Sequence, residues 1–473
     1  MKTNKSLHII IPFIAAILLS ACSTKDLSYD KPQNLIPQTW SKDNAYKELT
    51  FSTNSEALLW EKMILDEKLK EVIKISLNQN RSLKEAVANI EAARAKYRVQ
   101  KASELPSLDA DFSGSKSRSL NTSSTNNSTS NSESYSAKIG ISSYELDFFG
   151  KARNSTLADF ESFLSVKEAQ KTVHISLIAE VSNAWLTMAA DKSLLDYAKK
   201  TSLSSKKSLD IIDARIKAGI DSKATLYDEQ TTYYQALADV EKYTTLVAQD
   251  QNALDLLVGQ KIPEQLLPME LDENREYLSS IPIGLSSDIL LNRPDILEAE
   301  HNLKAANANI EVARAAYFPS ITITSAAGIA STALSNLFTG GASSIWSFAP
   351  NISLPIFDWG SKDASLDYAK SQRDLYVAKY ELAIQTAFSE VANALARYAT
   401  IENQLKAQEN LVNAHKNSLF LSERRYKSGV DTYLNTLISQ RSLYGSEQNL
   451  ISLHLAKISN RVTLYKVLAN DIK

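Results

Sequence analysis

The chain of 473 residues has one cysteine, 12 glycines and 11 prolines. A single cysteine excludes an internal disulfide, so the fold must depend on packing alone. The few glycines and prolines cluster, and the segments between them are rich in alanine, leucine, lysine, glutamate and glutamine, which favours long helices. Charges of both signs are mixed and the net charge is −2, so we expect no nucleic-acid partner.

No residue pattern typical of catalysis or cofactor binding is present. His174, His301, His415 and His454 are scattered and lack the spacing of metal ligands. The sequence has no glycine-rich phosphate loop, and its serines and threonines lack the setting of an activated nucleophile. We therefore predict that the protein is not an enzyme and holds no metal or cofactor.

The N-terminus is typical of an exported lipoprotein. Two early lysines are followed by an apolar run over residues 9–19 and then by the lipobox Leu19-Ser20-Ala21-Cys22. We predict a signal peptide over 1–21 and a lipid on Cys22 that anchors the chain without spanning the bilayer. An ordinary signal peptide with an incidental cysteine is the alternative. In similar lipoproteins an aspartate after the cysteine favours the inner membrane, so Ser23 favours the outer membrane.

The chain contains an internal repeat. Residues 180–184 (EVSNA) recur as 390–394 (EVANA), and residues 215–221 (RIKAGID) recur as 425–431 (RYKSGVD), so both shifts are 210 positions. A repeat of this length argues for one architecture of two similar halves.

The first copy carries a polar insertion. An earlier pair of matching segments, 90–95 and 310–315, is offset by 220 positions, so copy one has ten extra residues (220 − 210). They fall in the stretch 113–136, which is nearly all serine, threonine and asparagine. Because such a run buries little apolar surface, we expect a long exposed loop there.

Two stretches without glycine or proline, 151–218 and 361–428, predict helices of about 100 Å each at about 1.5 Å per residue. Gly219 and Gly429 follow them as C-caps, so each long helix should turn back on itself at a tight polar tip. The expected return helices cover 223–258 and 432–469.

Between the helical parts, apolar and polar residues alternate in segments of about ten residues, which predicts strands. We place one β-hairpin at 107–149 and a second at 319–358. Aromatic residues at the strand ends suit a membrane interface, so transmembrane strands around a wet lumen are expected. Four strands cannot close a barrel, so the chain should oligomerise. Two soluble β-hairpins would alternate in the same way and remain the alternative.

The predicted organisation is mostly helical with a small β part. Its segments in order are a signal peptide (1–21), an N-terminal anchor and equatorial segment (22–56), repeat 1 (57–258), an equatorial linker (259–287) and repeat 2 (288–470).

Several motifs together resemble one known family. They are Leu291-Asn292-Arg293-Pro294-Asp295-Ile296, the run from Ala305 to Ile321, Tyr144-Glu145-Leu146-Asp147-Phe148-Phe149-Gly150, Leu354-Pro355-Ile356-Phe357-Asp358-Trp359-Gly360 and the tip motif at 425–431. In this order they resemble the outer-membrane efflux lipoproteins of the TolC/OprM type, over essentially the whole mature chain.

The resemblance implies a homotrimer with a twelve-stranded transmembrane barrel, continued by a long α-helical tunnel into the periplasm. It implies a passive exit duct in the outer membrane for drugs or other toxic small compounds. The implied partners are a periplasmic adaptor protein and an inner-membrane transporter of the resistance-nodulation-division class, besides outer-membrane lipid.

The same resemblance puts a gate at the periplasmic tips. Its candidate residues in copy two are Arg425, Tyr426, Asp431, Leu434 and Ile438. The candidate tip partners are Arg215, Asp213, Asp221, Gly219 and Gly429. Similar proteins have an aspartate four positions after the leucine that matches Leu434; here that position is Ile438, which favours an apolar gate.

Two other functions stay open at this point. The chain could be a lipid-anchored periplasmic coiled-coil adaptor or scaffold without a pore, or the outer-membrane duct of a protein secretion system. A duct predicts heat-resistant trimers and single-channel conductance, whereas a scaffold predicts neither.

Overall fold

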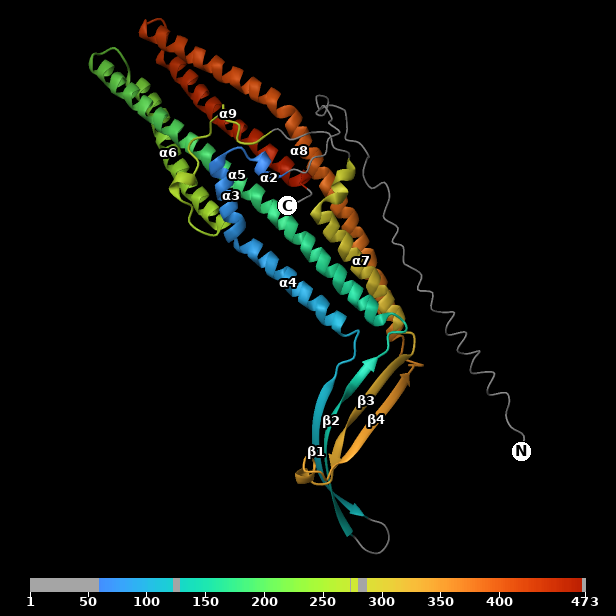
Figure 1. Cartoon of the computed structure of the whole chain (residues 1–473). Coiled ribbons are helices and arrows are strands. Elements are labelled where there is room, and N and C mark those ends of the chain that lie inside the picture. The colour runs from blue at the N-terminus through green and yellow to red at the C-terminus, as the bar shows by residue number, and fades with distance from the viewer. Residues whose placement is uncertain (1–58, 122–127, 273, 280–286, 470–473) are drawn as a thin grey trace. The chain divides into compact units, whose positions relative to one another are not determined.

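The computed structural model describes residues 59–121, 128–272, 274–279 and 287–469 (Figure 1). The chain divides into two compact units, which we describe separately. Of the described residues, the first unit holds 90–165 and 299–380, and the second holds 59–89, 166–298 and 381–469. The N-terminal segment 22–56, with Cys22, lies outside the described residues, as does the predicted signal peptide.

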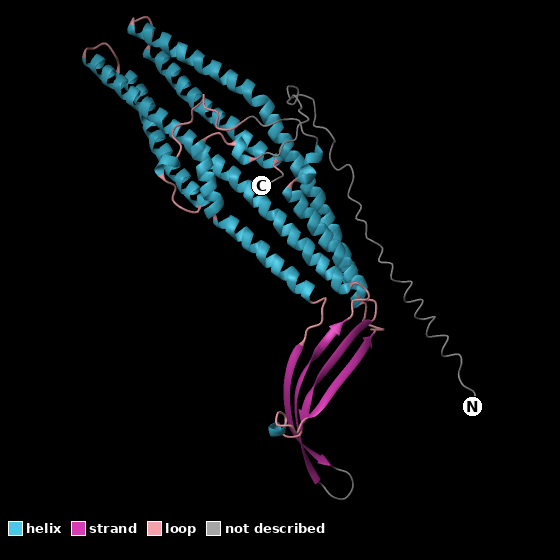
Figure 2. Cartoon of the chain, in the orientation of Figure 1, coloured by secondary structure: helices cyan, strands magenta, loops and turns pink. Residues whose placement is uncertain are grey.

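The first unit contains a four-stranded antiparallel sheet with the order β1-β2-β3-β4 (Figure 2). Its strands are β1 (Asp109–Asn121), β2 (Ser128–Glu145), β3 (Ser320–Ser331) and β4 (Ser343–Ser353). Both expected hairpins, 107–149 and 319–358, contain their two strands, and the central pairing of β2 with β3 joins the two copies of the repeat. The same unit includes parts of the helices α4 (Arg81–Ala102), α5 (Lys151–Lys217), α7 (Pro294–Ala315) and α8 (Ser361–Lys427).

The strand register gives the sheet one apolar and one polar face. Ile139 of β2 pairs with Ala110 of β1 and with Ala327 of β3, which in turn pairs with Trp346 of β4. Because side chains alternate along each strand, the other residues of this face can be read from the register. They include Phe112, Ala137, Ile141, Ile321, Ile323, Ile329, Phe348 and Ile352. The opposite face carries Asp111, Ser113, Ser136, Lys138, Ser142, Thr322, Thr324, Ser347 and Asn351.

The stretch 113–136 corrects one expectation. Most of it is not a loop, because β1 continues to Asn121 and β2 begins at Ser128. Backbone pairing persists through Asn121↔Ser128, and the side chains of Ser113 and Ser136 hydrogen-bond at 2.9 Å. Short hydroxyl side chains can pair across an antiparallel ladder without a hydrophobic core, which explains how so polar a segment forms strands.

The second unit is built around two helical hairpins. Hairpin 1 comprises α5 and α6 (Lys223–Val258), and hairpin 2 comprises α8 and α9 (Tyr433–Leu468). Figure 1 shows the two hairpins in green and red, with their tips at the same end. The helices α5 and α8 end one residue before the expected 218 and 428, α9 is one residue shorter at each end than the expected 432–469, and α6 covers 223–258 as expected.

The helices of this unit are held together by the apolar stripe of each copy. In copy one the buried residues include Leu177, Ile178, Val181, Trp185 and Met188, and in copy two Ile384, Ala387, Val391, Ala394 and Leu395. Their three- and four-residue spacing places the members of each set on one face of their helix. In the central part of α5, Ala179, Leu186 and Ala190 are buried as well, so there the helix is covered over more than one face.

The linker 259–287 is described at 259–272, 274–279 and 287, and the first two of these parts contact the segment around α2 and α3 and the helix α5. Leu278 forms an isolated antiparallel bridge with Ile64, which follows α2 (Trp60–Met63). Asp66 caps α3 (Glu67–Gln79) and also pairs with Arg275 at 2.6 Å. Further along, the indole N–H of Trp185 on α5 donates to the Leu266 carbonyl at 3.0 Å.

The Asn-Arg-Pro-Asp motif has a structural role. Arg293 is buried and donates to the carboxylates of Asp295 and Glu390 at 2.7 and 2.9 Å, and to the Val467 carbonyl at 3.1 Å. Pro294 then opens α7, where its missing N–H costs nothing. One guanidinium therefore joins the start of α7 to α8 and to the end of α9.

Candidate gate at the hairpin tips

Both hairpin tips have the same backbone geometry. Gly219 and Gly429 adopt φ of 70° and 72°, a left-handed conformation that favours glycine. The amide of Ile220 donates to the Arg215 carbonyl at 2.9 Å, and the matching amide of Val430 donates to the Arg425 carbonyl at 3.0 Å. This is the Schellman pattern, which satisfies the last carbonyls of a helix and reverses the chain within a few residues.

The same ion pair stabilises each tip. In hairpin 1, Arg215 Nε donates to Asp221 Oδ2, and in hairpin 2, Arg425 Nε donates to Asp431 Oδ2 at 3.1 Å. Asp431 also accepts from the amide of Thr432 and from the side chain of Asn435, which lowers the pKa of its carboxyl. Each aspartate therefore holds the turn of its own hairpin.

A hydrogen bond from Tyr426 joins the two hairpins. The Tyr426 hydroxyl donates to Asp221 Oδ2 at 2.7 Å, and the Arg215 guanidinium lies 4.9 Å from the centre of the Tyr426 ring. Copy one has Ile216 at the position that matches Tyr426 (426 − 210), so Asp431 receives no equivalent bond from hairpin 1. The repeat is asymmetric at this point, and the asymmetry creates the link.

The protonation states favour this link. Burial opposes ionisation of Asp221, but the hydrogen bonds from Tyr426 and Arg215 outweigh it, and the pKa of Asp221 is lowered. Burial and the bond to Asp221 raise the pKa of Tyr426 to about 12. A carboxylate and a neutral phenol are therefore the stable forms at neutral pH.

A second link lies farther from the tips. The Tyr433 hydroxyl donates to Glu229 Oε2 at 2.7 Å, and both side chains are buried. The Tyr433 ring packs edge-on against Tyr426 at 5.0 Å and contacts an apolar cluster with Ile212 and Leu437. Burial raises the pKa of Glu229, although the hydrogen bond from Tyr433 and the charge of Arg441 oppose this rise.

A third link repeats the pattern. The Tyr444 hydroxyl donates to Asp239 Oδ2 at 2.9 Å, and its ring stacks on Tyr197 of α5 at 5.4 Å. Tyr426, Tyr433 and Tyr444 of hairpin 2 thus each donate to a carboxylate of hairpin 1. We call the six residues of these links the tyrosine seam: Tyr426, Tyr433, Tyr444, Asp221, Glu229 and Asp239.

Other residues predicted from the sequence lie apart from this seam. Leu434 and Ile438 are one turn apart on α9 and are 53% and 52% exposed. Asp213 pairs with Lys217 of its own helix at 2.7 Å. Only Arg215, Asp221 and Tyr426 of the predicted set contact one another between hairpins. Glu229 and Tyr433 were not predicted, although Tyr433 replaces Lys223 of copy one, and a comparison of the two copies would have singled it out.

In the part of the chain that the structure describes, no three histidine, cysteine, aspartate or glutamate side chains gather in a way that could hold a metal ion. Its helices include none that combines the length and the apolar character needed to span a membrane.

Known proteins resemble the chain over nearly its full length. The family model described as outer membrane efflux protein matches residues 72–260 and 285–470. The probable efflux pump outer membrane protein TtgC of one Pseudomonas putida strain and the toluene efflux pump outer membrane protein TtgC of another are each 42% identical over 457 residues, 96% of this chain and 94% of theirs. The open-state MtrE outer membrane channel of Neisseria gonorrhoeae superposes with a TM-score of 0.83 and 34% identity, covering 93% of this chain and 97% of that one.

Proposed function

The chain belongs to the outer membrane efflux protein family, and we infer that it forms the outer-membrane duct through which an efflux pump discharges toxic compounds. We propose that three copies assemble, and that their sheets close into one barrel of twelve strands. The long helices of the three copies continue this barrel as a periplasmic tunnel.

The observation that carries this proposal is the strand register. It places apolar side chains such as Ile139 and Trp346 on one face of the sheet and hydroxyl or charged side chains such as Ser136 and Lys138 on the other. A sheet of this kind suits a barrel with lipid outside and water inside. Among the described residues, β1 and β4 each have a neighbour on one side only, so both edges are available to further copies.

The tyrosine seam supports a closed resting state. Its links hold hairpin 2 against hairpin 1, and opening the tunnel at the tips requires at least the Tyr426–Asp221 bond to break. Leu434 and Ile438, exposed on α9 near the tip, would then form an apolar constriction from which water is excluded. A partner that competes for Asp221 or Tyr426 would favour the open state.

Transport through the duct requires one partner that supplies the energy and another that joins this partner to the duct. We propose a periplasmic adaptor and an inner-membrane transporter of the resistance-nodulation-division class, since a duct without a catalytic site is passive. Lipid on Cys22 would anchor each copy to the outer membrane. The names of the relatives support the efflux role, and the lipobox supports the anchor.

The test is the oligomeric state and conductance of the purified chain. In detergent it should migrate as a heat-resistant trimer, and in planar lipid bilayers it should form ion-conducting channels. A monomer without conductance would support the pore-free scaffold instead.

A further inference from the structure

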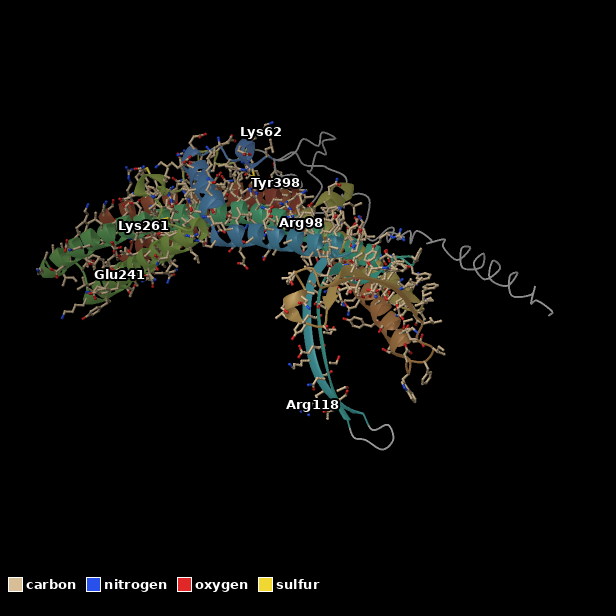
Figure 3. The ribbon with its side chains drawn as sticks, turned by 60° about the horizontal axis from the view of Figure 1, so that its bottom comes forward. Lys62, Arg98, Arg118, Glu241, Lys261 and Tyr398 are labelled. Carbon is tan, nitrogen blue, oxygen red and sulfur yellow. The ribbon has the colours of Figure 1, made fainter. Side chains whose placement is uncertain are left out.

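The hairpin of β1 and β2 extends beyond the rest of the sheet. Along β2, the pairing with β3 begins at Tyr135, whose partner Ser331 is the last residue of β3. Beyond this level β1 and β2 pair only with each other, up to Asn121↔Ser128. We call this two-stranded part, residues 115–121 and 128–134, the ribbon. Figure 1 shows it projecting past the ends of β3 and β4, and Figure 3 labels Arg118 within it.

The two faces of the ribbon differ in chemistry. One face is a continuous ladder of paired serines, namely Ser115↔Ser134, Ser117↔Ser132 and Ser119↔Ser130. The other face carries Lys116↔Glu133 and Arg118↔Asn131. Since side chains alternate along a strand, the serine face continues the polar face of the sheet, and the charged face continues its apolar face.

The order of side chains along that second face changes from apolar to aromatic to charged. Phe112↔Ala137 comes first, then Gly114↔Tyr135, then Lys116↔Glu133. The Tyr135 ring covers Gly114, where an added Cβ would lie 2.9 Å from the ring. An aromatic residue between an apolar band and charged residues marks the boundary between hydrocarbon and headgroups in a membrane strand.

The length of the apolar part of this face, between Tyr135 and Tyr144, also agrees with a membrane boundary at Tyr135. Tyr144 lies on the same face as Tyr135, nine residues farther along β2, because both pair with residues of the same face of β3. Nine residues span about 30 Å along a strand, which a tilt of about 40° reduces to about 23 Å of membrane thickness. This is close to the apolar band of about 25 Å that outer-membrane barrels present to lipid.

We propose that Lys116 and Arg118 bind the phosphate groups of lipid headgroups that surround the outer end of the barrel. This rests on the proposed function, because it takes the apolar face of the sheet to face lipid. The two cations lie two and four residues past the Gly114↔Tyr135 level, where the headgroups begin.

The contacts of the two side chains suit this role. Arg118 donates from Nη2 to Thr129 Oγ1 at 3.2 Å, and among the described residues no carboxylate forms an ion pair with it. Its planar guanidinium therefore has donors for a bidentate phosphate contact. Lys116 is paired with Glu133 but its side chain is 69% exposed, so a phosphate can reach the ammonium. Glu133 reduces the positive charge of this face and should weaken the binding.

The test measures how much diphosphorylated lipid A the full-length protein retains. The protein, immobilised in dodecyl maltoside, is equilibrated with mixed micelles that contain this lipid, and bound phosphate is assayed after washing. The variant K116S/R118S should bind roughly 5- to 25-fold more weakly, since each cation near an anionic membrane surface contributes about a factor of five. Glu133→Gln should bind more tightly than the unchanged protein. The matched control K206S/K207S removes two exposed lysines from α5 and should leave retention unchanged.

Equal retention by K116S/R118S and the unchanged protein would overturn the proposal. So would displacement of the lipid by inorganic phosphate at a concentration equal to that of lipid phosphate, because the site would then recognise the free anion. In phosphatidylcholine the choline cation balances the single phosphate, so micelles with this lipid in place of lipid A should show a much smaller difference between variants; an equal loss there would overturn the proposal, because the two cations would then not act on the uncompensated phosphates. Bilayer conductance is measured in parallel, and K116S/R118S should conduct like the unchanged protein. A conductance failure of the unchanged protein would count against the duct and not against the lipid site.

Discussion

Glu229 and Tyr433, 204 positions apart in the chain, share a 2.7 Å hydrogen bond in a site that is closed to solvent. Glu229 belongs to hairpin 1 and Tyr433 to hairpin 2, so the bond holds the two hairpins together behind the tips. A carboxyl at such a place is less easily ionised than in water, because burial penalises the charged form. The seam should therefore respond to pH at this residue.

We predict that Glu229→Gln stabilises the helical unit as pH rises above the ordinary range of a glutamate. Because the pKa of Glu229 is raised in the folded state, that state holds the proton more tightly than the unfolded state does. Its contribution to stability is complete below the unfolded pKa of about 4.3 and is lost as pH rises through the folded pKa. The variant has no proton to lose, so the difference in melting temperature between variant and unchanged protein should grow across this interval.

Melting followed by circular dichroism in detergent between pH 4 and pH 8 checks this. The matched control is Glu241→Gln, which alters an exposed glutamate of the same helix (Figure 3). If the difference in melting temperature between Glu229→Gln and the unchanged protein stays constant with pH, the prediction is wrong.

We predict that Tyr426→Phe raises the resting conductance of the channel. The substitution removes the donor to Asp221 but keeps the ring and the Arg215–Asp221 pair. A hydrogen bond to a charged group contributes about 1.5–3 kcal/mol, so the open fraction should rise roughly ten- to a hundredfold if that bond closes the tip. Single-channel recordings measure the open fraction. Tyr227→Phe, which removes an exposed hydroxyl from α6, should leave the recordings unchanged.

The same bond should resist mild acid. The pKa of Asp221 is lowered, so its contribution is present above the unfolded pKa of about 3.9 and is lost only as pH falls through the still lower folded value. Resting conductance should therefore not rise between pH 7 and pH 5. An increase already at pH 5 would show that another group controls closure.

Leu434→Ser combined with Ile438→Ser should also raise resting conductance. Both side chains are about half exposed on one face of α9, where hydroxyls would let water enter an apolar constriction. The pair L203S/I211S makes the same change at two exposed apolar residues of α5 and should have no such effect. If the α9 pair leaves conductance unchanged, Leu434 and Ile438 do not form the gate.

The sequence alone predicted the helices well, because their ends depend on local chemistry. Glycine accepts the left-handed turn at 219 and 429, and the absence of glycine and proline within 151–217 lets the helix continue. The family, inferred from motifs, is confirmed by the comparisons.

The seam could not be predicted in the same way. Tyr426 and Asp221 were both expected at the tips, but their pairing joins residues 205 positions apart and depends on how the two hairpins pack. The hydroxyl-rich strands could not be predicted either, because their low hydrophobicity is equally typical of an exposed loop. In a sheet the backbone bonds of β1 and β2 are satisfied by pairing, so serine is tolerated where neither face needs an apolar core.

Two glycine-to-alanine changes should act in opposite directions. At Gly328 a Cβ would lie 2.1 Å from the Ala137 carbonyl oxygen and 2.7 Å from Lys138 Cα, so β2 and β3 would have to move apart. Backbone shifts of this kind cost about 1–3 kcal/mol, and the heat-resistant trimer should be lost at a lower temperature.

Gly445 lies inside α9 with nothing within 4 Å of an added Cβ, so alanine there should stabilise the helix by about 0.5–1 kcal/mol. Both variants are compared by melting in the same detergent. A Gly328→Ala protein as stable as the unchanged one would mean that β2 and β3 do not approach as closely as the register requires.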